Sequence, residues 1–245
     1  KIDESGKEVP GKIALDGISL DIEKGSFVAV VGMNGSGKST LLRLMSGVYV
    51  PDSGAVLYDG KDATLPAVRE DVFFLPDDPF YAGQTTGKGV FDTYLTFYPN
   101  LDRELYRRLL ERFKLDENAH QRNFSKGMRR QAAAILGLSS MPDYLFFDET
   151  FDGLDPIARE NARRMIADEV SDGEVTVILS SHNLSEIENI CDSIVLIDAG
   201  HLLFQKSIED AVETTRKYQA VFEKECDVNF DGSDFVRVKK SGKLV

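Results

Sequence analysis

The sequence has few cysteines and no long hydrophobic run. No stretch approaches the roughly 18 apolar residues that a membrane-spanning helix needs, so we expect no such helix. No signal peptide is recognisable at Lys1, which favours a cytoplasmic location. The two cysteines, Cys191 and Cys226, have neither metal-binding nor redox spacing, so we expect buried free thiols in a reducing cytosol.

Positive charge is in the minority. The chain has 29 lysines and arginines against 41 aspartates and glutamates, a formal net charge of −12. Because nucleic-acid affinity comes largely from Lys and Arg contacts with phosphates, this balance argues against a nucleic-acid partner. It does not exclude a nucleotide, since backbone N–H groups can create a local positive field. The 245 residues suffice for one large α/β domain with an added lobe.

A glycine-rich loop at Gly32–Ser39 is the most specific motif. It fits G-x-x-x-x-G-K-[ST], whose backbone N–H groups cradle nucleotide phosphates. The preceding Phe27–Val31 is typical of a buried strand, and the apolar stripe of Leu41–Met45 predicts a helix that ends at Gly47. Such a helix directs its free N–H groups and the positive end of its dipole at an anion. A glycine-rich turn that only joins strand to helix is the alternative.

Individual roles follow from the chemistry of this loop. We expect Lys38 to reach the β- and γ-phosphates, the Ser39 hydroxyl to ligate Mg²⁺ and Thr40 to contact the α-phosphate. The glycines allow close approach of the main chain because no Cβ intrudes. The predicted nucleotide-binding residues of the loop are Asn34, Gly35, Ser36, Gly37, Lys38, Ser39 and Thr40.

A second candidate site lies at the end of the apolar segment Tyr144–Phe147. Two acids, Asp148 and Glu149, follow it. In a protein with a phosphate-binding loop, the first acid holds Mg²⁺ through water, and the second can orient and deprotonate the attacking water. The ion, as the largest local charge, would keep Asp148 ionised. Taken alone, the pattern fits equally well an ordinary strand that ends in solvated acids.

The order of segments predicts an α/β fold with a mainly parallel sheet. Apolar runs separated by helical patterns are typical of strands buried on both faces in βαβ units, and these runs are Val72–Leu75, Tyr144–Phe147, Val175–Leu179 and Ile194–Ile197. Ile18–Ile22 and Val56–Tyr58 predict a small antiparallel sheet beside this core. We expect a main domain at 1–205, an inserted α-helical lobe at about 82–138, and a C-terminal appendage at 206–245.

The segment Phe124–Gln131 distinguishes among the families of phosphate-binding-loop proteins. Together with the motifs above, it resembles the nucleotide-binding subunits of ABC transporters over about residues 10–205. Ser125–Arg129 is similar to the family's signature sequence, Gly153–Asp155 to its D-loop and Ser180–His182 to its switch-histidine segment. The glycine-rich loop and the acidic strand end match its Walker A and Walker B elements. No Asn-Lys-x-Asp element of the kind that reads guanine is present.

The resemblance implies an ATPase that works as a dimer. Two such domains would pack head to tail around two ATP molecules, with Ser125 and Gly127 of one domain facing the Walker A loop of the other. Asp155 would contact the facing loop as well. Binding of ATP would close the dimer, and hydrolysis would reopen it. The catalytic residues that the resemblance implies are Lys38, Glu149 and, as a γ-phosphate sensor, His182.

The motif details are most similar to bacterial ATPases paired with peptide, antibiotic or lipid exporters. The implied partners are integral membrane subunits and a second ATPase subunit, identical or related. This would place the chain on the inner face of the cell membrane. A surface at about 77–98 would receive the membrane subunits. Most aromatic residues there are expected in the lobe core, with one or two reaching the partner: Phe80, Tyr81, Phe91, Tyr94, Phe97 and Tyr98.

Several positions depart from the family pattern. Lys126 and Met128–Arg129 replace the usual signature residues, as in some exporter ATPases. Asp77 stands where the family usually carries Gln. An ionised Asp can only accept hydrogen bonds, and Asp77 is a third candidate ligand for Mg²⁺ or its water. No aromatic residue lies near Val9–Gly11 to stack on adenine, so Ile13 is the candidate for an apolar contact with the base.

Three other functions compete with export. A non-transport ABC ATPase of translation or DNA repair would carry two cassettes, a long coiled coil or a basic surface, which this sequence lacks. The second alternative is an importer ATPase, and the details of the motifs argue against it only mildly. A catalytically silent regulatory subunit is opposed by the presence of Glu149 and His182.

Overall fold

The computed structural model describes residues 13–79, 85–150, 154, 156–170, 174–182 and 190–214. The chain divides into two units, 1–208 and 209–245. Predictions that concern Phe80, Tyr81, Asp155 and Cys226 fall outside the described residues.

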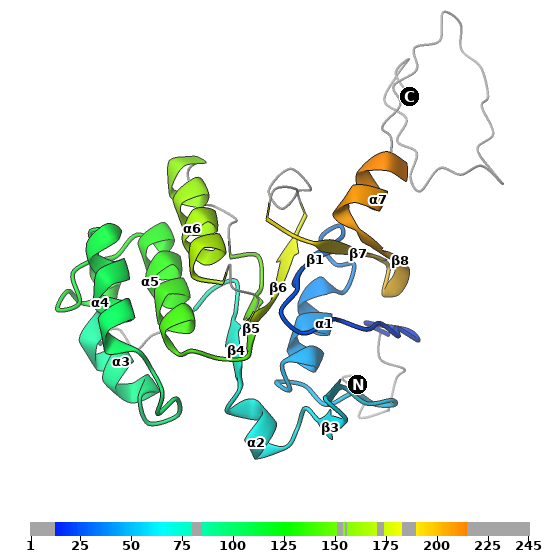
Figure 1. Cartoon of the computed structure of the whole chain (residues 1–245), viewed down its shortest axis with the longest axis horizontal. Helices are drawn as coiled ribbons and strands as arrows, with labels where there is room; N and C mark the ends of the chain where they lie inside the picture. Colours follow the sequence, from blue (N-terminus) through cyan, green and yellow to red (C-terminus); the bar gives the residue numbers. More distant parts are fainter. Residues whose placement is uncertain are drawn as a thin grey trace, which may run out of the picture. The chain divides into compact units, whose positions relative to one another are not determined.

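A six-stranded sheet forms the centre of the larger unit (Figure 1). Its order is β4-β5-β6-β1-β7-β8, with the first five strands parallel and β8 antiparallel to β7. The strands are β1 Phe27–Val31, β4 Val72–Leu75, β5 Tyr144–Phe147, β6 Thr176–Ser181, β7 Ser193–Asp198 and β8 His201–Ser207. The predicted α/β fold with a mainly parallel sheet is confirmed.

Helices connect the strands, and three of them gather in a lobe. α1 (Lys38–Met45) follows β1, and the short α2 (Pro66–Arg69) precedes β4. Between β4 and β5 the chain forms α3 Gly87–Tyr94, α4 Arg103–Arg112, a 3-10 turn at Gln121–Asn123 and α5 Lys126–Ser139. Figure 1 shows α3, α4 and α5 beyond the β4 edge of the sheet, away from β7 and β8. The remaining helices are α6 Pro156–Glu169 and α7 Ile208–Thr214.

Side-chain caps determine where the lobe helices begin. The Thr86 side chain accepts a hydrogen bond from the Gly89 N–H at the start of α3. Asp102 accepts two, at 2.8 and 2.9 Å, from the first turn of α4. Ser125 Oγ accepts the Met128 N–H, at 3.1 Å, at the start of α5. Each cap satisfies N–H groups that have no acceptor inside the helix, so the polar residues of the sequence fix these boundaries.

The predicted strand at Ile18–Ile22 is wrong. Its side chains alternate between half-buried and exposed, as predicted, but the segment is not a strand. Ile18, Leu20 and Ile22 pack on the main apolar cluster of the sheet. The alternation therefore reflects side-chain burial, with no sheet pairing among the described residues. Among the described residues, the small antiparallel sheet consists of two strands, β2 Leu57–Tyr58 and β3 Lys61–Asp62.

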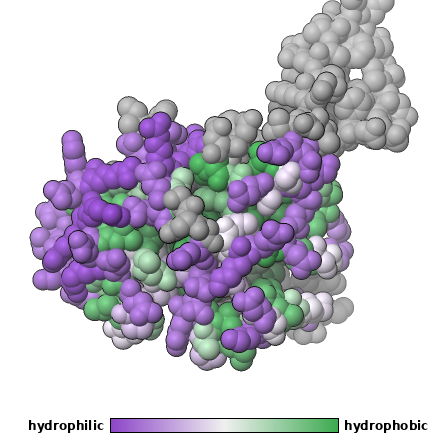
Figure 2. All heavy atoms as spheres, in the orientation of Figure 1, coloured by the Kyte–Doolittle hydropathy of each residue, from purple (hydrophilic) through white to green (hydrophobic). Residues whose placement is uncertain are grey.

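The aromatic residues of the lobe lie mostly in its interior. Phe91 is buried, and the rings of Tyr94 and Tyr98 lie 5.8 and 5.6 Å from that of Phe73 in β4. For these residues the prediction of a lobe core is confirmed. Phe97 is 65% exposed. Figure 2 shows mainly hydrophilic side chains over the outer side of the lobe, in agreement with the many charged residues of α4.

The predicted buried free thiol at Cys191 is confirmed. Burial raises the pKa of this thiol, and the neighbouring Asp192 raises it further. A neutral buried thiol behaves as a small apolar side chain, so Cys191 has a packing role.

The backbone of α5 approaches the sheet closely at Gly137. A Cβ atom there would lie 2.9 Å from Phe73 Cε1 and 3.3 Å from Leu145 Cδ1. Both of these residues are buried. A glycine at this helix position therefore lets the lobe pack directly on β4 and β5.

We predict that Gly137→Ala lowers the free energy of unfolding by about 1–3 kcal/mol, because the new methyl group overpacks a closed site. Gly89→Ala in α3 is the matched control, since its Cβ would lie no closer than 3.4 Å to any neighbour. That change should stabilise the helix by about 0.5–1 kcal/mol. Urea unfolding of both variants measures the difference, and equal effects would contradict the close packing of α5.

Candidate active site

The glycine-rich loop joins β1 to α1, as predicted. A Cβ at Gly32 would lie 2.3 Å from the Ile197 carbonyl oxygen, which leaves no room for a side chain. Gly37 has φ +112°, and a Cβ there would lie 2.5 Å from Leu15 Cδ2. The chain therefore needs glycine at these two positions to close the loop over the helix N-terminus. The N-cap residue of α1 is Gly37, which has no side chain to cap the helix, so the first N–H groups of α1 can bind an anion.

The loop borders a cavity of about 630 Å³. All seven loop residues predicted to bind the nucleotide line it, together with the predicted general base, Glu149. Ile13, the candidate for the base contact, also lines the cavity and is 69% exposed, and Met33 is 51% exposed beside it. The lining residues are Ile13, Ala14, Met33, Asn34, Gly35, Ser36, Gly37, Lys38, Ser39, Thr40, Glu149, Asp198 and Ala199.

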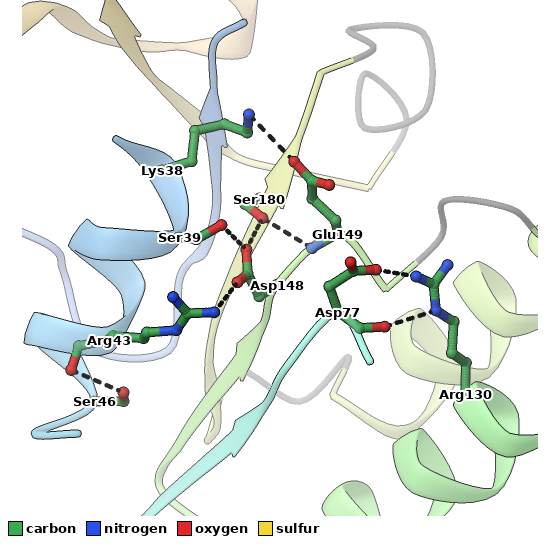
Figure 3. Close-up of polar contacts among 9 residues, drawn as sticks. All are labelled: Lys38, Ser39, Arg43, Ser46, Asp77, Arg130, Asp148, Glu149 and Ser180. Carbon is green, nitrogen blue, oxygen red and sulfur yellow. Dashed lines mark hydrogen bonds and ion pairs between the residues drawn. The ribbon is translucent and has the colours of Figure 1, made fainter. Parts of the chain in front are cut away.

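Lys38 is almost fully buried, and its ammonium group lies at the loop (Figure 3). Its Nζ donates hydrogen bonds to the carbonyl oxygens of Gly32 at 3.0 Å and Met33 at 3.2 Å. The same nitrogen lies 3.4 Å from Glu149 Oε1. The Lys38 ammonium group is therefore buried among hydrogen-bond acceptors. A triphosphate bound at the loop would supply further acceptors, its phosphate oxygens, at the same place.

The Asp148 carboxylate is the centre of a buried hydrogen-bond network. Its Oδ1 accepts from Ser39 Oγ at 2.9 Å and from Ser180 Oγ at 2.8 Å. No described residue donates a hydrogen bond to its Oδ2, although Arg43 Nη2 lies 3.8 Å away. Asp148 itself is 1% exposed. The arrangement joins α1, the end of β5 and β6 through one charged group, as Figure 3 shows.

This network fits a magnesium ion. No cluster of three or more His, Cys, Asp or Glu side chains suited to a metal occurs among the described residues. Mg²⁺, however, is usually held by one or two carboxylates together with phosphates and water. The buried Asp148 Oδ2, to which no described residue donates, and the neighbouring Ser39 hydroxyl are oxygen ligands of this kind.

Glu149 has a left-handed backbone conformation, with φ +47°. Its N–H donates to Ser180 Oγ at 2.9 Å, and its carboxylate faces the cavity. Left-handed conformations are uncommon for residues other than glycine and are frequent at functional sites. Ser180 thus binds both acids, accepting from the Glu149 N–H and donating to Asp148. Sequence reasoning placed Ser180 in the switch segment but missed this role.

The remaining predicted site residues lie outside the cavity lining. Ser125 is exposed at the N-terminus of α5, and Gly127 follows in its first turn. His182 is exposed directly after β6, the strand between β1 and β5. Asp155 lies outside the described residues, whereas its neighbour Leu154 is buried.

Asp77 lies beyond the end of β4, and its partner is Arg130 of α5. Arg130 Nε donates to the Asp77 carbonyl oxygen at 2.9 Å, and Nη2 pairs with the Asp77 carboxylate. The pairing was not predicted, because the two residues are 53 positions apart.

The carboxyl ends of β1, β4, β5 and β6 therefore bring together a phosphate-binding loop and two carboxylates, which defines a P-loop nucleoside triphosphatase. A family model described as ABC transporter matches residues 15–152, over half of the chain. The chain therefore belongs to the ABC transporter family, as an ATP-binding subunit with ATPase activity. Among the described residues, no helix is long and apolar enough to cross a membrane.

Known proteins share most of their length with this chain. The ABC transporter ATP-binding protein YtrB of Bacillus subtilis is 31% identical over 91% of this chain and 76% of its own length. The lantibiotic transport ATP-binding protein SrtF of Streptococcus pyogenes is 27% identical, over 91% and 98%. The methionine import ATP-binding protein MetN of Caulobacter vibrioides is 30% identical, over 89% and 70%. A solved ATP-binding subunit of an ABC transporter has a TM-score of 0.73 at 26% identity, over 82% and 86%.

We predict that Ser180→Ala lowers kcat about tenfold or more, because it removes a hydrogen bond to each acid of the site. ATP affinity should change less, since Ser180 is not among the residues that line the cavity. Ser139→Ala is the control: this buried hydroxyl donates to the Ile135 carbonyl of its own helix. Steady-state ATPase assays test the pair, and equal losses in both variants would contradict the assignment.

Proposed function

We propose that this chain hydrolyses ATP to drive export through separate integral membrane subunits. The observation that carries the proposal is the meeting of the glycine-rich loop, Asp148 and Glu149 at one cavity. The ATPase domain is assigned to residues 1–205, with the helical lobe at about 82–138 and an appendage at 206–245. The end of the larger unit at residue 208 supports this boundary.

In the proposed reaction, the loop N–H groups and Lys38 bind the triphosphate and stabilise the charge that develops on the γ-phosphate. Glu149 orients a water molecule and takes its proton as the water attacks phosphorus. Ser39 and Asp148 would hold Mg²⁺, which supplies further charge neutralisation when bound. Asp77, the third residue predicted to hold the metal, reaches it only if its carboxylate leaves Arg130. His182 would sense the γ-phosphate.

The proposed active form is a dimer, either of two copies or of this chain and a related one. Ser125 is exposed at the start of α5, which supports a contact with a nucleotide bound to the neighbouring subunit. The α5 N-terminus would then offer its N–H groups to the γ-phosphate, with Gly127 allowing close approach. Asp155 would contact the facing loop. Neither subunit alone would satisfy the triphosphate, so ATP would hold the two together.

Import is the second candidate direction. SrtF is named as a lantibiotic transport protein and MetN as a methionine import protein, and both are similar to this chain over most of its length. The signature segment with Lys126 and Met128 favours export. In either case the chain would bind the inner face of the cell membrane through its membrane subunits.

We predict that Glu149→Gln lowers kcat by about 100-fold or more while ATP still binds, because only proton removal from water is lost. In ATP and Mg²⁺ this variant should accumulate as a stable dimer in size-exclusion chromatography with light scattering. Lys38→Ala is the control, since it removes the principal phosphate cation and should stay monomeric. Unchanged turnover in Glu149→Gln would show that Glu149 is not the base.

Purification of the Glu149→Gln variant from its native membranes tests the transport partner. ATP should increase recovery of one integral membrane protein in stoichiometric amount, and Lys38→Ala should not respond to ATP. Reconstitution of that complex in vesicles then determines the direction of transport. Recovery of ribosomes or DNA in place of a membrane protein would support a non-transport ATPase.

A further inference from the structure

Acidic residues follow two neighbouring strands at the edge of the sheet that carries the nucleotide cavity: Asp77 and Asp78 after β4, and Asp148 and Glu149 after β5. Leu75 of β4 is paired with Phe147 of β5, and the Asp148 N–H donates to the Leu75 carbonyl at 2.9 Å. Asp77 follows Leu75 by two residues, as Glu149 follows Phe147. Figure 3 shows Asp77 beyond the end of β4 and Glu149 beyond the end of β5. A free carboxylate here would repel the triphosphate that the loop binds.

Arg130 reduces this repulsion, because it pairs with both the carbonyl oxygen and the carboxylate of Asp77. Its guanidinium donates to the Asp77 carbonyl oxygen through Nε and pairs with the carboxylate through Nη2. The Arg130 side chain is 3% exposed, whereas that of Asp77 is 47% exposed. Nη1 of Arg130 is also buried, and no acceptor reaches it among the described residues. Asp77 is thus the acid that compensates a buried cation.

We propose that Arg130 is a positioning residue that fixes Asp77 on α5 and neutralises its charge beside the phosphate site. The inference rests on the proposed ATPase function. Asp77 then contributes no ligand to the metal, because its departure would leave Arg130 buried without an anion, which is strongly unfavourable. The pair also ties the loop after β4 to the helix that begins at Ser125. Movement of that helix would therefore carry Asp77 with it.

The experiment compares ATP affinity in four variants of the full chain by equilibrium titration with and without Mg²⁺. Arg130→Gln should weaken ATP binding by about tenfold, because it leaves the Asp77 charge uncompensated at the edge of the sheet that carries the nucleotide cavity. The double variant Asp77→Asn with Arg130→Gln has no charge to free, and its dissociation constant should return to within about threefold of the parent. Arg130→Lys keeps the positive charge, so it should bind ATP nearly as the parent does.

Urea unfolding of the same variants separates charge from structure. Arg130→Lys loses the two-point geometry, so its unfolding midpoint should fall although ATP affinity does not. Equal ATP affinities of Arg130→Gln and the double variant would overturn the proposal. A loss of affinity in Asp77→Asn that occurs only with Mg²⁺ would also overturn it and assign Asp77 to the metal. Failure of the parent chain to bind ATP would instead contradict the proposed function itself.

Discussion

The buried carboxylate of Asp148 is the interaction on which the site depends. A charge that is 1% exposed must be compensated by hydrogen bonds, and its Oδ1 receives them from Ser39 of α1 and Ser180 of β6. The same requirement fixes the distance between the phosphate-binding loop and the acidic end of β5. Glu149 is placed by its backbone bond to Ser180. The phosphate-binding loop, the proposed metal ligands and the proposed base are thus parts of one network, and none can shift without disturbing the others.

The parallel sheet makes this network possible. Because neighbouring parallel strands end at the same edge, β1, β5 and β6 deliver their following residues to one place, although Ser39 and Asp148 are 109 positions apart. The antiparallel β8 follows β7 on the far side and adds no residue of the network. The close approach of α5 at Gly137 packs the lobe against β4 and β5, and this helix carries Arg130 and begins at the cap Ser125.

Much of this could be predicted from sequence, because its signals are local. The strand Phe27–Val31, the glycine loop and the acids after Tyr144–Phe147 are contiguous patterns with a direct physical meaning. Ser180 and Arg130 were missed because their roles consist of contacts between segments far apart in sequence. The false strand at Ile18–Ile22 shows the opposite error: alternating burial was present, but a pairing partner is a property of the fold that one segment cannot reveal.

The left-handed backbone at Glu149 limits which residues can replace this glutamate during evolution. The turn is held by the peptide group and Ser180, whereas the proposed role as general base belongs to the carboxylate alone. Asparagine and glycine adopt this conformation readily, and β-branched residues do not. Relatives that have lost the activity but still bind a nucleotide should therefore carry mainly asparagine or glycine at the position of Glu149. Valine, isoleucine or threonine at this position would mark the loss of the turn itself.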